Sequence, residues 1–232
     1  MASYPPHGRI VAPPRRWPYA AGVIDPRRPF LLLDNAATGQ AWLLDDLAEA
    51  VAIDRPDQVA PAIARLAQPG PWGGYLGYEA GYALEPRLAG LRQAPPAGQP
   101  LGWFGRFGRV APVQVDDLLA GQDDAGIGPL TPGIDQAEHA AALARLQGWI
   151  TAGDIYQGNL TFPAEVAVQG QPLALYRRLR AGARAPYGAL LFTGALWVLS
   201  FSPELFFRMD GRHLETRPMK GTARRGRFAA ED

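Results

Sequence analysis

The sequence predicts an α+β protein in which antiparallel β-sheets are flanked by helices, and three observations support this. Of the 232 residues, 47% are hydrophobic and 19% are charged, which is ample material for a packed core. Segments with helical periodicity alternate with strand-like runs through most of the chain. Near its end, several short strand-like runs follow one another with tight turns between them, as in an antiparallel sheet.

Composition excludes several classes of protein and site. No apolar run approaches the ~20 residues that cross a bilayer, and the start of the chain lacks the apolar stretch of a signal peptide. We therefore expect a soluble, cytoplasmic protein without a membrane partner. The absence of cysteine excludes disulfides, zinc–thiolate sites and thiol nucleophiles. The three histidines, His7, His139 and His213, lack the spacing of metal ligands.

The amino-terminal third begins with a Pro-, Arg- and aromatic-rich segment, residues 1–21, which we expect to be irregular. The apolar run Phe30–Leu33 predicts a buried strand that ends in a turn at Asp34-Asn35. Over Trp42–Ile53, apolar residues recur at helix-like spacing, which predicts a helix. A second helix is expected to start within Pro61–Leu66.

The middle of the chain combines turn clusters with strand-like runs. Pro69–Gly74 is rich in turn residues, and Tyr75–Tyr78 begins an aromatic, strand-like stretch. Leu101–Val115 is expected to be a strand broken by glycines. Gln93–Pro100 and Gly121–Gly133 predict turn-rich connectors, and the second is the better candidate for a boundary between modules.

Two helices and a strand are expected after that boundary. The D-x-x-E spacing at Asp135–Glu138 predicts a capping box, followed by a helix that runs to about Ala152 and is ended by Gly153. Tyr156–Val168 is strand-like. Pro172 is expected to open the second helix, because proline is favoured at the first helical position.

The last quarter of the chain predicts a series of short strands, namely Ala189–Thr193, Leu196–Phe201, Leu205–Met209 and His213–Arg217. The Asp210-Gly211 pair predicts a type I′ hairpin turn between the last two. Antiparallel pairing about that turn places Glu204 beside Arg217. Glu204 should therefore face the start of the segment that contains Lys220.

The net charge of +1 is unevenly distributed. Residues 177–232 carry eleven lysines and arginines against five acidic residues. Such a cationic segment suggests an anionic ligand, with an ordinary solvated surface as the alternative. A small carboxylate or phosphate is favoured over nucleic acid, because no pattern of stacking aromatic residues surrounds the arginines.

Lys220 is the only lysine, beside 22 arginines. An amine can lose its proton and act as a nucleophile, which a guanidinium cannot do near neutral pH. With Glu204 in the same dry pocket, the pair suits nucleophilic attack with general acid catalysis, and a cross-strand ion pair is the alternative. The Gly221 N–H, the Thr222 hydroxyl and the arginines at 224, 225 and 227 suit recognition of a carboxylate.

Four strings in this chain resemble, in order and spacing, those of the chorismate-utilising enzymes: Gly153–Leu160, Pro186-Tyr187, Ser202–Glu204 and Arg217–Thr222. The resemblance is close over residues 133–232, looser around Gly74–Glu79, and closest to component I of the aminodeoxychorismate synthases. It implies an anthranilate synthase component I-like fold. Residues 1–130 would form the amino-terminal region, and residues 131–232 the first part of the chorismate-binding catalytic domain.

The resemblance also implies a mechanism. Lys220 would attack C2 of the chorismate ring while Glu204, as general acid, assists loss of the C4 hydroxyl. Ammonia from a glutamine amidotransferase partner, component II, would add at C4, and release of the lysine would leave 4-amino-4-deoxychorismate, on the route to para-aminobenzoate and folate. Gly221 and Thr222 would contact the substrate. Anthranilate synthases usually have alanine where Lys220 stands.

An effector site is also implied by the resemblance. The tryptophan-binding members of the family have a serine in an early Leu-Leu-x-Ser string, where this chain has Asn35. Pro186, Tyr187 and Gly188 resemble the second part of that site, with a structural role for Tyr187 as the alternative.

The chain departs from the family's pattern in two further ways. Gly158 stands where the family has valine or a similar residue, which should loosen that strand. The family's magnesium-binding glutamates lie beyond the Lys220 motif, so no metal ligand is expected within this chain and the Mg²⁺ ligands are expected after residue 232. We therefore expect this chain to be incomplete as a fold and inactive alone.

Two other functions stay open. The chain could belong to an anthranilate or isochorismate synthase, which identification of the product would reveal. It could also be a non-catalytic module in which Glu204 and Lys220 pair and the arginines bind an anion. Such a module would hold chorismate without Mg²⁺ and without turnover.

Overall fold

The computed structural model describes residues 24–91, 98–122, 124–219 and 226–228. The chain divides into two compact units. Unit 1 comprises residues 1–120 and 176–232, and unit 2 comprises residues 121–175. The predicted α+β class is confirmed, since every paired strand is antiparallel and helices accompany the sheets. No helix in the described part of the chain is long and apolar enough to cross a membrane.

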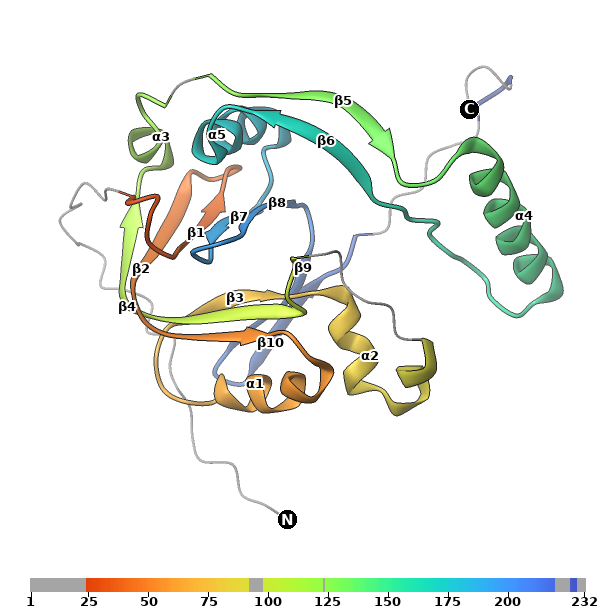
Figure 1. Cartoon of the computed structure of the whole chain (residues 1–232), viewed down its shortest axis with the longest axis horizontal. Coiled ribbons are helices and arrows are strands. Elements are labelled where there is room, and N and C mark those ends of the chain that lie inside the picture. The colour runs from red at the N-terminus through yellow and green to blue at the C-terminus, as the bar shows by residue number, and fades with distance from the viewer. Residues whose placement is uncertain (1–23, 92–97, 123, 220–225, 229–232) are drawn as a thin grey trace, which may run out of the picture. The chain divides into compact units, whose positions relative to one another are not determined.

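Unit 1 is built on a six-stranded sheet with the order β3-β4-β2-β1-β7-β8 (Figure 1). Its strands are β1 (Phe30–Asn35), β2 (Gln40–Ile53), β3 (Trp72–Leu76), β4 (Gly102–Val113), β7 (Tyr187–Phe192) and β8 (Trp197–Ser202). A separate hairpin pairs β9 (Leu205–Asp210) with β10 (His213–Arg217). The predicted strands at 30–33, 101–115 and 189–217 are confirmed to within a few residues.

The helices of unit 1 are short. They are α1 (Val59–Arg65), α2 (Gly81–Leu84) and α3 (Val115–Leu118), with 3-10 turns η1 (Pro56–Gln58), η2 (Tyr78–Ala80) and η3 (Pro86–Leu91). The longer helix α5 (Pro172–Ala183) begins in unit 2 and continues into unit 1 from Tyr176. The predicted helix starts near Pro61 and at Pro172 are both confirmed.

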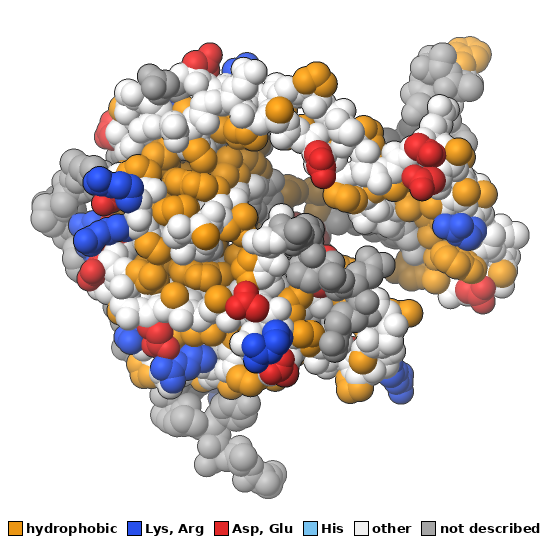
Figure 2. Space-filling view, viewed as in Figure 1, with side chains coloured by type: hydrophobic (Ala, Val, Ile, Leu, Met, Phe, Trp, Pro, Cys, Tyr) orange, Lys and Arg blue, Asp and Glu red, His pale blue; other side chains and the backbone are white. Residues whose placement is uncertain are grey.

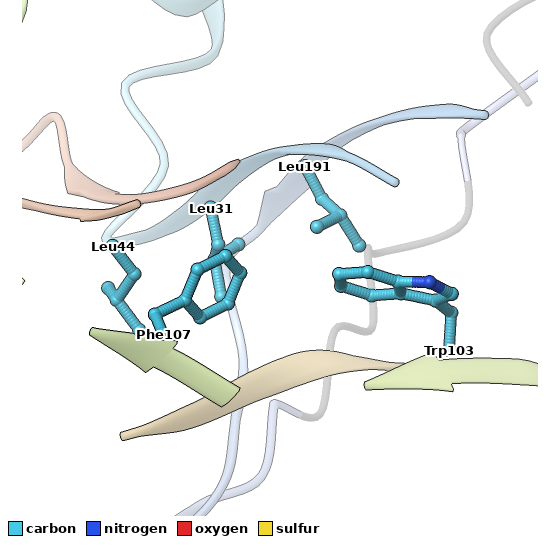
Figure 3. Close-up of a cluster of buried hydrophobic side chains, with 5 residues drawn as sticks. All are labelled: Leu31, Leu44, Trp103, Phe107 and Leu191. Atoms are coloured by element: carbon cyan, nitrogen blue, oxygen red, sulfur yellow. The ribbon is translucent and has the colours of Figure 1, made fainter. Parts of the chain in front are cut away.

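The core of unit 1 lies inside the curled sheet. Leu31 of β1, Leu44 of β2 and Leu191 of β7 point toward Trp103 and Phe107 of β4 (Figure 3), and each of the five is at most 5% exposed. Hydrophobic side chains also gather across the face of unit 1 that Figure 2 shows. Because side chains alternate along a strand, the neighbouring residues of β1, β2 and β7 face the other side of the sheet, where Leu32, Leu43 and Leu190 are buried.

The predicted helix over Trp42–Ile53 is wrong: this segment is the long strand β2. From Leu47 onward its side chains alternate between half-buried and exposed, the period of a strand with one covered face. β2 pairs with β1 on one side and β4 on the other, and this pairing overrides the helical preference of its alanines and leucines. The pairing of β2 with β4 shifts register between Leu47 and Glu49, and Asp46, just before this bulge, has φ 58°.

Two turn predictions also need correction. Within the predicted turn cluster Pro69–Gly74, β3 has already begun at Trp72, and Gly74 lies so close to β4 that a Cβ there would meet the Trp103 carbonyl oxygen at 1.9 Å. The β9–β10 loop consists of Gly211 and Arg212 rather than Asp210-Gly211. Only Gly211 has a positive φ, 58°, which fits a type II′ rather than a type I′ turn.

Unit 2 consists of the helix α4 (Gln136–Ala152) and a two-stranded ribbon of β5 (Gly126–Pro132) and β6 (Ala164–Gln169). The helix is confirmed at both ends. At its start the Glu138 N–H donates to Asp135 Oδ1 at 2.8 Å and the Asp135 N–H donates to Glu138 Oε2 at 2.9 Å, and Gly153 ends it at φ 83°.

Two strand expectations in unit 2 are wrong. The predicted connector Gly121–Gly133 contains the strand β5. In contrast, the predicted strand Tyr156–Val168 is extended and paired only from Ala164 onward. Gly158 therefore lies outside any strand, and a Cβ there would meet the tip of Leu146 on α4 at 2.5 Å. A small residue at 158 lets this loop pack against the helix.

Candidate functional site

The β9–β10 hairpin brings two sequence motifs together. Arg217, in the last position of β10, pairs with Leu205, the first residue of β9, after a register shift beyond Glu215. Glu204 immediately precedes Leu205, so the strand end that carries Glu204 lies beside the segment Arg217–Met219. The predicted proximity of these two segments is therefore observed, although the turn that creates it is offset by one residue.

Glu204 is held by three hydrogen bonds. Its N–H donates to Ser202 Oγ at 3.1 Å, and the Ser202 hydroxyl donates to the Glu204 carbonyl oxygen at 3.0 Å. Its side chain accepts a hydrogen bond at Oε1 from the Met219 N–H, at 2.9 Å. Ser202 thus fixes the backbone of the turn after β8, and Met219 fixes the direction of the carboxylate.

A cavity of about 320 Å³ opens beside Glu204. Its lining comes from the two ends of the hairpin: Ser202, Glu204, Leu205, Phe206, Thr216 and Pro218. Glu204 itself is exposed, so the dry pocket expected around the carboxyl is not formed by the residues that the structure describes.

Arg217 is the last residue of β10. Its Nε donates to Glu215 Oε1 at 2.5 Å, and the Tyr187 side chain, at the start of β7, acts on its guanidinium electrostatically. Hydrogen bonding to Glu215, with the charge of that carboxylate and the electrostatic effect of Tyr187, raises the pKa of Arg217 above its ordinary value. Arg217 is thus a fixed positive charge two residues before Met219.

The four expected effector residues gather at one end of unit 1's sheet. Asp34 pairs with Gly188 across β1 and β7, which brings Asn35 to the Pro186–Gly188 segment. Asn35 Oδ1 accepts hydrogen bonds from the N–H groups of Ala37 and Thr38, both at 3.1 Å, so its side chain closes the β1–β2 turn. Pro186 and Tyr187 are half-buried.

Sequence reasoning missed a buried polar network beside these residues. Asp34 is the one charged residue that is buried in the described part of the chain. Its carboxylate accepts hydrogen bonds from Arg180 Nε at 2.6 Å, Arg180 Nη2 at 3.3 Å and the Tyr176 hydroxyl at 3.1 Å. Burial and the neighbouring Asp34 carboxylate raise the pKa of Tyr176 well above its usual range.

Three of the expected site residues, Lys220, Gly221 and Thr222, lie outside the described residues, as do Arg224 and Arg225. Among the residues that are described, no three carboxylate or imidazole side chains are grouped so that they could hold a metal ion.

A family model described as chorismate binding enzyme matches residues 24–232. The match covers the β-sheet, both strands of the hairpin and the Glu204 site. The chain belongs to the chorismate-binding enzyme family, and the anthranilate synthase component I-like fold that the resemblance implied is consistent with its curled antiparallel sheet.

Curated relatives carry two different names. The chain is 34% identical over 89 residues to aminodeoxychorismate synthase component 1 of Salmonella typhimurium and 41% identical over 91 residues to anthranilate synthase component 1 of Thermus thermophilus. These segments cover 38% and 39% of this chain. It is also 40% identical over 107 residues, 45% of its length, to an aminodeoxychorismate synthase of Streptomyces griseus.

The matches span only 20%, 20% and 15% of those three proteins. The comparisons therefore establish a chorismate-utilising family without separating the two reactions that the relatives are named for.

Proposed function

We propose that this chain carries part of the active site of an enzyme that aminates chorismate at C4, giving 4-amino-4-deoxychorismate. The family supports chorismate as the substrate. The choice of reaction rests on Lys220, which stands where anthranilate synthases usually have alanine, and on the relatives named as aminodeoxychorismate synthases.

One observation carries the proposal: the Met219 N–H holds the Glu204 carboxylate at 2.9 Å, and Lys220 follows Met219 in the sequence. A carboxyl group that contacts Met219 and an amine on the next residue of the chain can act on two positions of one small ring. This is the arrangement that nucleophilic attack with general acid assistance requires.

The proposed reaction has two stages. The neutral Lys220 amine forms a bond to C2 of the ring, the ring double bonds shift, and the C4 hydroxyl leaves as water after taking a proton from Glu204. Ammonia then forms a bond to C4 and gives up a proton that restores Glu204, the double bonds shift back, and the lysine leaves C2 as the neutral amine. The reaction replaces the C4 hydroxyl group by an amino group without changing the oxidation state of the ring, so no oxidant or reductant is needed.

The remaining roles follow the same proposal. The Gly221 N–H and the Thr222 hydroxyl bind a substrate carboxylate, and Arg217 contributes positive charge to a site for a dianion. A positive charge near Lys220 favours its neutral form, which the attack needs. A glutamine amidotransferase partner supplies the ammonia.

Anthranilate synthesis is the second candidate, favoured by the 41% identity to the Thermus thermophilus component 1. The two reactions place nitrogen at different ring positions, so their products differ. A non-catalytic module, the remaining alternative, would bind chorismate but form neither product.

The test is to supply the natural protein with chorismate, Mg²⁺ and ammonium and to identify the product by mass spectrometry. We expect 4-amino-4-deoxychorismate. The Glu204→Gln variant, whose amide oxygen can still accept the Met219 N–H, should lower kcat by about 100-fold because the proton donor is lost. Formation of anthranilate, or binding without any product, would contradict the proposal.

A further inference from the structure

The strand that leads to Glu204, β8, lies at the edge of the six-stranded sheet. Within the described part of the chain its only strand partner is β7, with which it pairs from Trp197 to Ser202. Glu204 follows two residues after Ser202, and its side chain is exposed. The position of its carboxyl group therefore depends on how firmly the last residues of β8 are held.

Phe201, next to last in β8, lies in one row of the sheet with two residues of the neighbouring strands. It pairs with Gly188 of β7, and Gly188 pairs with Asp34 of β1. Residues in one row of an antiparallel sheet have their side chains on the same face. Gly188, in the middle of the row, has no side chain, and a Cβ there would stand 2.9 Å from the Tyr176 hydroxyl oxygen. The glycine therefore leaves the space in which Tyr176 contacts both of its neighbours.

Tyr176 of α5 contacts both ends of this row. Its ring stacks on the Phe201 ring, with 5.0 Å between the centroids and 20° between the planes. Its hydroxyl donates a hydrogen bond to Asp34 Oδ2 at 3.1 Å. Tyr176 is fully buried. Because buried side chains are close-packed, its ring is a rigid support for Phe201.

The connection from this aromatic stack to Glu204 is short. Phe201 adjoins Ser202, whose hydroxyl accepts a hydrogen bond from the Glu204 N–H at 3.1 Å and donates one to the Glu204 carbonyl oxygen at 3.0 Å. Pro203, between these two residues, has a φ that its ring restricts. Few free torsions therefore separate the stacked ring from Glu204. Such support matters, since a misplacement of about 1 Å at a reacting group can lower a rate by about 100-fold.

We propose that Tyr176 is a positioning residue for Glu204. Stacked on Phe201, its ring fixes the end of β8 and thereby the place from which the Glu204 carboxyl group gives its proton to the leaving hydroxyl. This inference rests on the function proposed above for Glu204. Tyr176 acts through Phe201 and Ser202 and takes no part in the chemistry itself. A ring with a packing role alone would contribute to stability and not to the rate of the chemical step.

The kinetic test compares two substitutions in the natural protein, with chorismate, Mg²⁺ and ammonium, by the loss of chorismate whatever the product. Tyr176→Phe keeps the stacked ring and should keep kcat within about twofold. Tyr176→Leu removes the ring and should lower kcat about tenfold with KM nearly unchanged, because Glu204 acts in the transition state. Leu101→Ala truncates a buried side chain in the separate cluster around Ile53, so it controls for lost stability and should leave kcat unchanged.

A double substitution tests whether Tyr176 acts through Glu204. In Glu204→Gln no proton donor is left to position, so adding Tyr176→Leu should lower kcat by less than about twofold further. Circular dichroism of each variant checks that it is folded. An equal loss of kcat from Tyr176→Leu with and without Glu204→Gln would overturn the proposal, as would an equal loss in Tyr176→Phe and Tyr176→Leu.

Hydrogen exchange at two amides gives a second readout that needs no turnover. The Glu204 N–H donates to Ser202 Oγ, and the Met219 N–H donates to the Glu204 carboxylate. Both should exchange at least about fivefold faster in Tyr176→Leu and at an unchanged rate in Tyr176→Phe. Unchanged exchange in a folded Tyr176→Leu variant would overturn the proposal. No turnover, or a different product, would contradict the proposed function alone, because amide exchange would still decide whether Tyr176 holds Glu204 in place.

Discussion

Asp34 of β1 attaches the helix α5 to the sheet of unit 1, because it hydrogen-bonds with Tyr176 and Arg180 of that helix. Its side chain is 1% exposed and that of Arg180 is 16% exposed, and the Tyr176 hydroxyl completes the network. A buried charge that loses its partner costs far more free energy than an exposed pair contributes. The ends of this network come from β1 and α5, so it fixes the β1–β7 end of the sheet.

We predict that Asp34→Asn lowers the free energy of unfolding by about 3–5 kcal/mol, because the Arg180 guanidinium is left without its buried counter-charge. Urea unfolding measures the loss. Asp116→Asn is the matched control: Asp116 also pairs with Arg180, but its side chain is 90% exposed, and its loss should cost less than about 1 kcal/mol. Equal effects of the two substitutions would show that burial does not set the strength of this pair.

Tyr176 gives the network a pH dependence. Its pKa is raised in the folded protein by burial and by Asp34, so the stabilisation it provides is complete below its unfolded pKa, near 10, and is lost as the pH rises through the folded value. Tyr176→Phe should cost about 1 kcal/mol of unfolding free energy at pH 8. The difference from the unsubstituted protein should shrink above about pH 10, and a constant difference from pH 8 to 11 would contradict this origin.

At the scale of elements, two glycines near this network should respond to alanine with opposite signs. A Cβ on Gly188, in β7, would stand 2.9 Å from the Tyr176 hydroxyl oxygen and 3.0 Å from the Asp34 carbonyl oxygen, so Gly188→Ala should cost about 1–3 kcal/mol. Gly182, in α5, has no atom within 4 Å of that position, and Gly182→Ala should stabilise the protein by about 0.5–1 kcal/mol.

Thermal or urea unfolding of the two glycine variants measures both changes. Unchanged stability in Gly188→Ala would show that the close packing of β7 against Tyr176 does not limit the side chain at 188, and destabilisation by Gly182→Ala would show that position 182 does not have the open space described for it.

Elements with local signals could be predicted from the sequence. The helix α4 begins at the capping box of Asp135 and Glu138 and ends at Gly153, and all three residues act within their own helix. The β9–β10 hairpin follows from short strands around a glycine turn, and its pairing placed Glu204 near Arg217. These interactions join residues no more than about a dozen positions apart, so a short stretch of sequence contains them.

Elements determined by distant partners could not be predicted. The segment Gln40–Ile53 has residues that favour a helix, and it becomes a strand because β1 and β4 flank it on both sides. The partners of Asp34 lie 142 and 146 residues further along the chain. A single acidic residue at a strand end gave no indication of either, and its burial becomes evident only when α5 packs against β1.

For the molecule as a whole, the chorismate site that we propose at the carboxyl-terminal hairpin rests on family membership and on local geometry. The family model covers residues 24–232, and Glu204 is fixed beside the segment that leads to Lys220. The central claim is that Lys220 forms a covalent bond to the substrate ring. The sequence offers a single amine side chain for this purpose.

The covalent bond can be measured directly on one peptide. Trypsin normally cleaves after Arg212 and Lys220, and it does not cleave the Arg217–Pro218 bond, so unmodified protein releases residues 213–220. A ring attached to the Lys220 amine blocks cleavage there and leaves residues 213–224 as one heavier peptide. Lys220→Gln is the control, because it keeps a polar side chain of similar length without the nucleophile.

The decisive experiment is mass spectrometry of this peptide after the natural protein is incubated with chorismate and Mg²⁺ in the absence of ammonia. We predict a chorismate-derived mass on residues 213–224 that decreases when ammonium is added and never appears in Lys220→Gln. Turnover to an aminated product with the Lys220 peptide always unmodified would contradict the account.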